Sequence, residues 1–468
     1  MCSRLVAQPG KERQSGVELL GWFKAAVLGT ALLGCARAGA GATGEPLPAW
    51  GERVQLASGE AHRGPWRMNE SDYRWVDDPT VALSPSGEVT VAWVDQVRKD
   101  VLFQRCAAEA ARGCGAPMNV SLSPQTFSWL PRLSVPAHAP QRVYLLWQEI
   151  IFSGGSHGGE ILFATSRDAG VTFSAPLNLS NSKAGDGKGR LDVSTWDNGS
   201  LDVLAGAADQ LYVAWTEYDG ALWFRRSMDA GNTFQPPLRL AGGQSSPARA
   251  PSIALGRGNA VYVAWALGES SEADIHFSAS SDGGASFGFA RAVVPGPGRS
   301  DAPKLAVSAD DTLHLVHAES TSPGSATSCI RYARRRPGAP GFDAARCLTG
   351  SESRSGEVGK YPQLAVDASG AVYVLWERYL EGADRARGLV LSSSNNTFGH
   401  FGMPISVPGI SGPELGDNGS QQGMLTRKLA VTPGGSIAVV NSTFKAGDAS
   451  HIWLLRGTLG PAAALKAP

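Results

Sequence analysis

Five carboxylates stand at matching places along the chain, each one or two residues after the end of a short apolar run. They are Asp95, Glu149, Glu217, Glu319 and Glu377. Hydrolysis of a glycosidic bond needs two carboxyl groups about 5–9.5 Å apart, one as general acid and the other as nucleophile or base. These five residues are therefore candidate catalytic residues, although the sequence does not show which two would converge. Their alternative role is structural, as polar groups at strand ends or as partners of nearby Lys and Arg.

A second set of residues stands just before other apolar runs and has the chemistry of ligand binding. It consists of Trp129, Arg249, Lys360, Tyr361 and Arg427. The planar fork of an arginine binds a carboxylate through two parallel hydrogen bonds. A tryptophan ring can stack on a sugar, but packing inside the fold explains Trp129 equally well. We predict all five as ligand-binding residues, and Tyr361 also as a catalytic candidate.

Both sets flank a repeated pair of strands. Seven runs rich in Val, Tyr and Trp, such as VYLLWQE and LYVAWTE, predict buried β-strands. A shorter apolar stretch precedes each run and often opens with a proline fourteen residues before the tryptophan, as in Pro79 and Trp93. A third and usually a fourth apolar strand follow. This pattern predicts an all-β fold, a β-propeller of four-stranded antiparallel blades, with seven blades and six as the alternative.

The two ends of the repeat complement each other. The seventh unit ends at residues 451–457 without a fourth strand, whereas residues 50–58 form an apolar strand with no unit of its own. We predict that this N-terminal strand closes the last blade, which removes an exposed sheet edge. The propeller then spans residues 50–457, and residues 458–468 form a C-terminal tail.

One phrase, Ser-x-Asp-x-Gly-x-Thr/Ser-Phe, occurs three times, around Asp168, Asp229 and Asp282. It lies between the third and fourth strands of a unit, where a hairpin turn is expected. The Asp carboxylate can accept hydrogen bonds from the turn, the Gly allows a positive φ, and the aromatic ring can pack back into its own blade. We predict a structural role for it on the face opposite the candidate site residues.

The cysteines support the same division into units. Cys106 and Cys114 flank the third-to-fourth turn of the first unit, and Cys329 and Cys347 lie on the third and fourth strands of the fifth. Neither unit carries the repeated phrase. We predict two disulfides, Cys106–Cys114 and Cys329–Cys347, as expected for an exported chain.

The repeated phrase resembles the Asp box, or bacterial neuraminidase repeat, of the sialidase superfamily and of many exported propellers, over nearly all of residues 50–457. The resemblance implies three arginines that grip a substrate carboxylate, a Tyr–Glu nucleophile pair and an Asp acid. Arg249-Ala250-Pro251 is similar to the family's Arg-Ile-Pro, and Tyr361 in KYPQL resembles the nucleophile region. The first unit departs from the family because it has Asp77 where an arginine is expected.

The N-terminus has the pattern of a targeting segment. Basic residues precede a short apolar run, and Leu32-Leu33-Gly34-Cys35 resembles the bacterial lipoprotein box. We predict a signal peptide over 1–34, lipidation of Cys35, a linker over 35–49 and a place in the cell envelope, in the outer membrane. The alternative is an ordinary signal cleaved near ARAGA, residues 36–40.

Charge and composition limit the partners. Lys and Arg total 42, as do Asp and Glu, so no net charge would recruit nucleic acid or anionic lipid. No residues have the spacing of a metal site, and we expect no cofactor; calcium in an Asp/Gly-rich loop is an alternative that no motif supports.

We predict a monomeric, lipid-anchored propeller that recognises a glycan or an envelope protein without catalysis. A sialidase-like exo-glycosidase and a purely structural propeller are the alternatives, so enzymatic activity is left open.

Overall fold

The structure is a computed structural model that describes residues 48–151, 159–182, 187–192, 195–197, 200–296, 298–320, 328–349, 357–380, 382–394, 400–419 and 425–460. The predicted signal segment, the predicted lipidation site Cys35, most of the linker and the end of the tail lie outside these residues. Among the described residues, no helix has the length and apolar character needed to cross a membrane.

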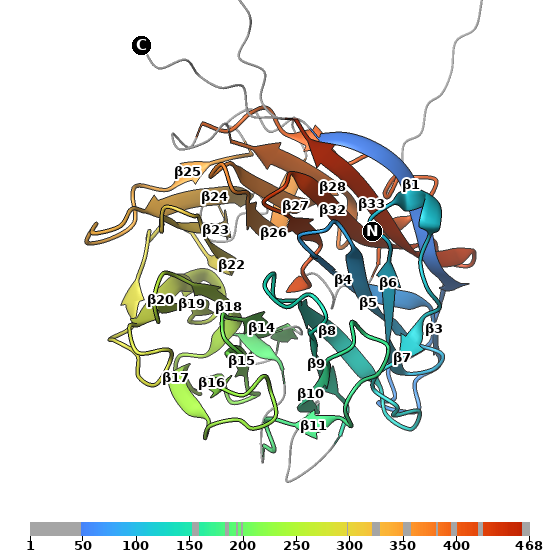
Figure 1. The fold of residues 1–468 in the computed structure, drawn as a ribbon, viewed down its shortest axis with the longest axis horizontal. Coiled ribbons are helices and arrows are strands. Elements are labelled where there is room, and N and C mark those ends of the chain that lie inside the picture. The colour runs from blue at the N-terminus through green and yellow to red at the C-terminus, as the bar shows by residue number, and fades with distance from the viewer. Residues whose placement is uncertain are drawn as a thin grey trace, which may run out of the picture. The chain divides into compact units, whose positions relative to one another are not determined.

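Six four-stranded sheets and one five-stranded sheet, all antiparallel, form the seven blades of a β-propeller (Figure 1), which confirms the predicted fold class. Blade 1 contains β4 (Val76–Leu83), β5 (Val89–Asp95), β6 (Asp100–Cys106) and β7 (Met118–Asn119). Blade 2 contains β8 (Ser128–Ser134), β9 (Val143–Glu149), β10 (Glu160–Ser166) and β11 (Leu177–Asn178). Blade 3 contains β14 (Leu201–Ala205), β15 (Leu211–Thr216), β16 (Ala221–Ser227) and β17 (Leu238–Gly242). Blade 4 contains β18 (Ala248–Leu255), β19 (Val261–Leu267), β20 (Asp274–Ser280) and β21 (Arg291–Ala292).

The remaining blades follow the same order. Blade 5 contains β22 (Ser300–Val307), β23 (Leu313–Ser320), β24 (Ser328–Arg335) and β25 (Arg346–Cys347). Blade 6 contains β26 (Glu357–Val366), β27 (Val372–Leu380), β28 (Ala386–Ser393) and β29 (Ile405–Ser406). Blade 7 contains β31 (Leu429–Val431), β32 (Ser436–Phe444), β33 (Ala449–Leu459) and β1 (Pro48–Glu60), with β30 (Asp417–Asn418) also paired to β32.

Short elements connect the blades. The pairs β2 (His62–Arg63) with β3 (Tyr73–Arg74) and β12 (Gly189–Asp192) with β13 (Thr195–Asp197) form small ribbons. Two 3₁₀ turns span Ala110–Arg112 and Ser270–Glu272.

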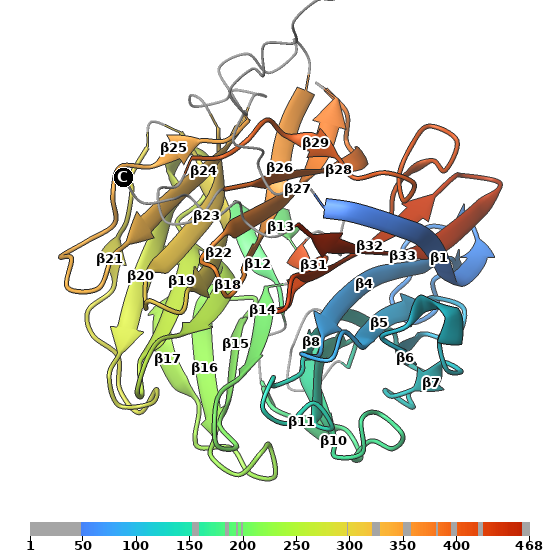
Figure 2. The same ribbon diagram turned by 45° about the horizontal axis from the view of Figure 1, so that its top comes forward.

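The N-terminal strand closes the ring as predicted. β1 pairs with β33 along its length, from Pro48 opposite Leu459 to Glu60 opposite Ala449, with two register shifts. Figure 2 shows the blue β1 running beside the dark red β33. Both strands extend about two residues beyond the predicted limits, 50 and 457.

The second strand of each blade carries the core. Trp93, Trp147, Trp215 and Trp265, which end the Val- and Tyr-rich runs, are among the largest fully buried side chains. A strand with a blade packed against each face reads as a continuous apolar run because both of its faces are buried. This is why these runs were readable as strands from the sequence.

The repeated phrase forms a tight, hydrogen-bonded turn. Asp168 Oδ1 accepts hydrogen bonds from Thr172 N at 2.9 Å and from Ser166 Oγ at 2.8 Å, and Oδ2 accepts one from Thr172 Oγ1 at 2.6 Å. The corresponding side-chain bonds recur around Asp229 and Asp282. These hydrogen bonds, led by that of the Thr172 hydroxyl, lower the pKa of Asp168 to about 2.

The aromatic ring of the turn packs on the preceding blade, so the prediction that it packs into its own blade was wrong. Phe173 of blade 2 meets Phe103 of blade 1 edge to face, with ring centroids 5.1 Å apart, and Phe234 and Phe287 repeat the contact one and two blades on. Gly170 explains the need for glycine: its φ is +86°, and a Cβ there would lie 2.1 Å from the Phe103 ring. The turn therefore joins neighbouring blades as well as two strands.

The structure contains the two predicted disulfides. Cys106 bonds to Cys114, and Cys329 of β24 bonds to Cys347 of β25. The blade 1 disulfide lies at the third-to-fourth turn, where blades 2 to 4 have the hydrogen-bonded turn. The blade 5 disulfide joins the same two strands at their other end, because Cys329 stands at the start of β24, opposite Glu319 of β23.

Acid should remove the contribution of the turn carboxylates to stability. Since the pKa of Asp168 in the folded protein is lowered to about 2, the stabilisation is complete above the unfolded-state pKa of about 3.9 and is lost as the pH falls toward 2. We expect Asp168→Ala to lower the Tm at pH 7, and the difference from wild type to shrink near pH 2.5. Thr172→Val, which retains the carboxylate, is the matched control. Equal Tm differences for Asp168→Ala at both pH values would contradict the charge-based explanation.

Candidate functional site

The two ends of the propeller differ in what they carry. We call the end where first strands begin and second strands end the loop face, and the opposite end the turn face. The repeated turns lie on the turn face, because Ala169 N donates a hydrogen bond to Gln141 O in the turn between the first and second strands of the same blade. All five candidate carboxylates stand at or near the ends of second strands and therefore belong to the loop face, although Glu319 and Glu377 lie inside β23 and β27 rather than after them as predicted.

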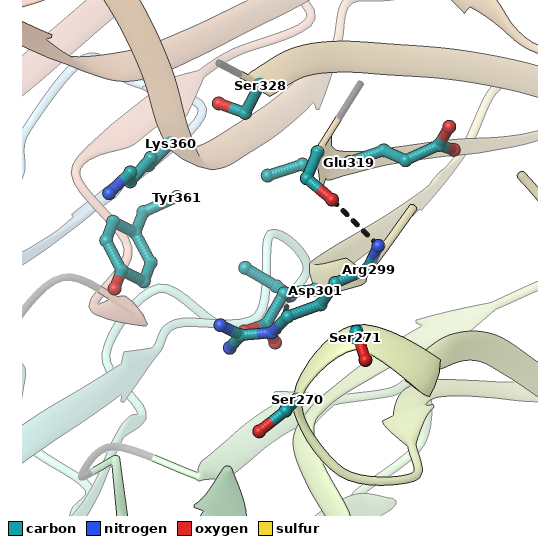
Figure 3. A pocket seen from close by; sticks show the side chains of 11 residues that line it. Ser270, Ser271, Arg299, Asp301, Glu319, Ser328, Lys360 and Tyr361 are labelled. Atoms are coloured by element: carbon teal, nitrogen blue, oxygen red, sulfur yellow. Dashed lines mark hydrogen bonds and ion pairs between the residues drawn. The ribbon is translucent and has the colours of Figure 1, made fainter. Parts of the chain in front are cut away.

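A cavity of about 430 Å³ opens on the loop face between blades 4, 5 and 6. We call it the loop-face pocket. Its polar and aromatic lining includes Ser270, Arg299, Asp301, Glu319, Lys360 and Tyr361. Figure 3 shows Lys360 and Tyr361 on one side of it, Glu319 on the other, and Arg299 reaching between them. Three of the predicted site residues thus share one pocket.

A β-bulge directs Tyr361 into the pocket. The register of β26 with β27 shifts between Lys360 and Gln363, and Tyr361 has a φ of +52°. A bulge re-aims a side chain, and a left-handed backbone costs a non-glycine residue roughly 1–2 kcal/mol. The same conformation occurs at the residue before proline in four other blades, at Asp78, Leu130, Ala250 and Ala302. It is therefore a property of the fold that blade 6 uses to present a tyrosine.

The cations of the pocket are held by specific partners. Arg299 forms an ion pair with Asp301, whose Oδ1 also accepts a 3.0 Å hydrogen bond from Arg249 Nε. Burial raises the pKa of Asp301, but the two guanidinium groups outweigh it and the pKa is lowered. Lys360 Nζ lies 4.8 Å from the centroid of the Tyr379 ring. Burial, and then the charge of Arg299, lower the pKa of Lys360.

Glu319 forms part of the wall and is closely surrounded. Arg331 Nη2 lies 3.0 Å from its Oε1, and a Cβ on Gly296 would fall 2.2 Å from the carboxylate. Burial raises the pKa of Glu319 despite the nearby charge of Arg331. The backbone at position 296 can lie this close to the Glu319 carboxylate only because residue 296 is a glycine.

The cations in and around the lining outnumber the lining carboxylates. Each lining carboxylate is paired with a cation that does not line the pocket, Asp301 with Arg249 and Glu319 with Arg331. The lining cations are Arg299, which also pairs with Asp301, and Lys360. Two cations beside a tyrosine ring and serine hydroxyls suit a polar ligand with an acidic group.

The other four candidate carboxylates do not reach this pocket. Asp95 accepts hydrogen bonds from the backbone of its own turn, at Val97 and Arg98. Glu149 accepts hydrogen bonds from Thr126, Ser128 and Trp147 of its own blade.

Glu217 is half-buried and Glu377 is buried. Burial raises the pKa of Glu217, with Ser182, Trp215 and Trp223 acting against it. Glu377 is 2% exposed and pairs with Lys428 and Asn418 of the neighbouring blade. The contacts of all four fit the structural role that the sequence left open.

Three predicted ligand-binding residues also lie outside the lining. Trp129 is buried and donates a 3.0 Å hydrogen bond to Gln96. Arg249 is 1% exposed and does not line the pocket, but it forms an ion pair with the lining residue Asp301. Arg427 bonds to Asp202 at 2.8 Å in the central channel.

The chain was compared with protein families, with curated proteins and with solved structures. No protein-family model matches the chain, and no curated protein matches it. The polysaccharide lyase Uly1 is 9% identical and has a TM-score of 0.56, over 88% of this chain and 100% of the lyase. The lectin BP39L from Burkholderia pseudomallei is 12% identical and has a TM-score of 0.51, over 81% of this chain and 94% of the lectin.

A sialidase is also among the matches. NanB from Streptococcus pneumoniae is 9% identical and has a TM-score of 0.45, over 69% of this chain and 68% of NanB. At these identities the likenesses show the fold alone, and the score of the sialidase is too low to support an argument about its site. The propeller of this chain is thus similar to folds found in glycan-acting enzymes and in a lectin.

Sequence reasoning missed Arg299, Asp301 and the pocket serines. One signal was available: Asp301 stands two residues before Pro303, as Arg249 stands two residues before Pro251. Equivalent positions in adjacent blades therefore carry opposite charges, which predicts an ion pair between the blades. Arg299, in contrast, had no equivalent in the other units.

Proposed function

We propose that this protein binds a glycan in the loop-face pocket without changing it, and that an acidic group on the glycan is held by Arg299 and Lys360. The observation that carries the proposal is the convergence of these two cations with the Tyr361 ring and several hydroxyl groups in one cavity. A tyrosine ring can cover the apolar face of a sugar while its hydroxyl and the serines bind sugar hydroxyls. The occurrence of the propeller in a lectin and in polysaccharide lyases agrees with this class of ligand.

Binding without catalysis is favoured by the state of the two lining carboxylates. Asp301 is held by two arginines, and Glu319 is paired with Arg331 and 2% exposed. Neither is placed as a ready nucleophile or base. The one observation in favour of a sialidase-like exo-glycosidase is the raised pKa of Glu319, which would suit a general acid.

A panel of chromogenic glycosides separates these two functions. If the protein only binds glycans, every chromogenic glycoside stays intact, even at protein concentrations that saturate the glycan array. Turnover that is lost in both Glu319→Gln and Tyr361→Phe would instead establish the glycosidase.

Tyr361→Ala should weaken glycan binding by at least about tenfold, the change that corresponds to a loss of about 1.4 kcal/mol. The variant should fold, because Ala250 and Ala302 occupy the same left-handed position in blades 4 and 5. Isothermal titration calorimetry with the best array ligand measures the effect. Lys445→Ala, on a half-exposed side chain near β33, is the control and should bind like wild type. Unchanged affinity in Tyr361→Ala would exclude the loop-face pocket as the site.

The affinity for an acidic glycan should decline as the pH rises, and the decline should begin at a lower pH than it would if Lys360 had the pKa of an ordinary lysine. The pKa of Lys360 is lowered by burial and by Arg299, and only the protonated ammonium attracts the acid. Affinity is therefore complete below this pKa and falls as the pH rises through it. Lys360→Arg retains its charge and should remove most of the decline, whereas a neutral glycan should show none. A pH profile unchanged by Lys360→Arg would refute this role.

The cellular context remains part of the proposal. A lipid on Cys35 would place the loop-face pocket at the cell envelope, and the repeated turns would be Asp boxes of an exported propeller. Metabolic labelling with an alkyne fatty acid, lost in Cys35→Ala, tests the anchor. An envelope protein retained by the wild type but not by Tyr361→Ala would indicate the other predicted partner.

A further inference from the structure

We infer that the central channel contains a second binding site, for a small organic carboxylate, at its turn-face end. A cavity of about 430 Å³ lies there, lined by the ends of the first strands of all seven blades. We call it the channel pocket. It shares no lining residue with the loop-face pocket.

The polar lining of the channel pocket comes from equivalent positions. The residue after the strand-one proline points to the centre in several blades, as Ser252, Lys304 and Gln363 do. Asp202 holds that place in blade 3, and Arg427 reaches in just before β31. Because the positions are equivalent, the channel gathers side chains from distant parts of the sequence at one level.

The charges at this level do not balance. Arg132, Lys304 and Arg427 lie within electrostatic reach of one another, and Asp202 and Asp78 are the facing carboxylates. Asp202 is already satisfied, by Arg427 at 2.8 Å and by Ile253 N at 2.8 Å. Where Lys304 is protonated, three cations face two carboxylates among these residues, and a single monoanion would neutralise the remaining positive charge.

Two donors at this level have capacity for a ligand. Among the described residues, Lys304 Nζ donates one hydrogen bond, to Leu425 O at 3.2 Å, out of the three that an ammonium can donate. Gln363 is 4% exposed, and its Nε2 has no partner among the described residues. A buried donor without a partner costs about 1–3 kcal/mol, so buried polar groups are normally satisfied. The unsatisfied amide therefore indicates that something else binds there.

The chemistry of the two donors points to a carboxylate. Lys304 lies on β22 and Gln363 on β26, which are the first strands of neighbouring blades. An ammonium on one strand and an amide N–H on the next can each donate to one oxygen of the same carboxylate. The cavity has room for a small organic acid.

The charge of Lys304 should make this site depend on pH. Burial is the main cause that lowers the pKa of Lys304, to about 7; Asp202 acts against it, and Arg132 and Arg427 act with it. Ser252 and Gln363, the other facing groups, do not titrate. An anion that binds the ammonium should be held below about pH 7 and released above it.

Titration calorimetry with acetate at constant ionic strength tests the inference, with acetamide as the uncharged control of the same shape. We expect one acetate per chain at pH 6, no binding of acetamide, and affinity at least tenfold lower at pH 9. Lys304→Met and Gln363→Leu should each weaken acetate binding at least tenfold. Lys360→Met, in the loop-face pocket, should leave it unchanged. The melting temperature of each variant reports whether it is folded.

The outcomes decide the inference whichever variant folds. No acetate binding, or equal binding by Gln363→Leu and wild type, would overturn the site. Chloride or phosphate binding more tightly than acetate, with the same dependence on Lys304, would overturn the assignment to a carboxylate.

Discussion

Removal of residues 48–60 should abolish the stable monomeric propeller. These residues form β1, which covers the edge of β33 along its whole length. Val54, Leu56 and Ala57 pack on the cluster between blades 7 and 1, and Trp50 packs on the cluster between blades 6 and 7. Four half-buried apolar side chains at about 1–2 kcal/mol each approach the net stability of a whole domain, about 5–15 kcal/mol.

The truncated chain should also be prone to association with other copies of itself. Without β1, the backbone groups of β33 form an open edge that can pair with another chain. We expect truncated protein to elute as oligomers in size-exclusion chromatography and to lose a single sharp unfolding transition.

A synthetic peptide of residues 48–60 should restore the monomer by pairing with β33 in trans. The same peptide with Val54→Asp and Leu56→Asp keeps the length but places charges on the apolar face, and should not restore it. A truncated protein that melts like the full chain would disprove the role of β1 in closure.

Substitution of Glu377 by alanine should lower the free energy of unfolding by about 3–5 kcal/mol, the range for breaking a buried ion pair. Glu377 is 2% exposed and pairs with Lys428, which is 5% exposed, across the interface of blades 6 and 7. Asn418 also donates to Glu377, and Asn441 in turn donates a 3.0 Å hydrogen bond to Asn418. The substitution leaves a buried ammonium without its counter-ion, which is the main source of the loss.

The matched variant is the double substitution Glu377→Leu with Lys428→Met. It removes both charges, and we expect it to recover most of the stability lost in Glu377→Ala. Urea unfolding of the wild type, Glu377→Leu, Lys428→Met and the double variant completes the cycle. A loss below about 1 kcal/mol in Glu377→Ala would contradict the importance of the pair. Glycan binding measured well below the Tm should be unaffected, in contrast to the expectation for a catalytic Glu377.

The sequence alone determined the blades, because their signals are local. A strand buried on both faces must be apolar throughout, and Trp93, Trp147 and Trp215 mark the ends of such strands at regular distances from their partners. The two disulfides and the closing strand followed from the same register. The propeller could be predicted because each blade repeats the same local pattern of apolar strands and turns.

The tertiary structure decided the site, because its members meet across blades. Tyr361 lines the pocket because its own backbone is left-handed within a β-bulge of blade 6. Arg299 and Asp301 line the same pocket from blade 5. Glu149, Glu319 and Glu377 carry the same sequence signal and all three are held by partners, but of the three it is Glu319 that lines the loop-face pocket. Sequence spacing gives the face on which a side chain lies, whereas its availability depends on partners supplied by adjacent blades. The direction of the aromatic in the repeated turn was misjudged for the same reason, since its partner Phe103 belongs to the blade before.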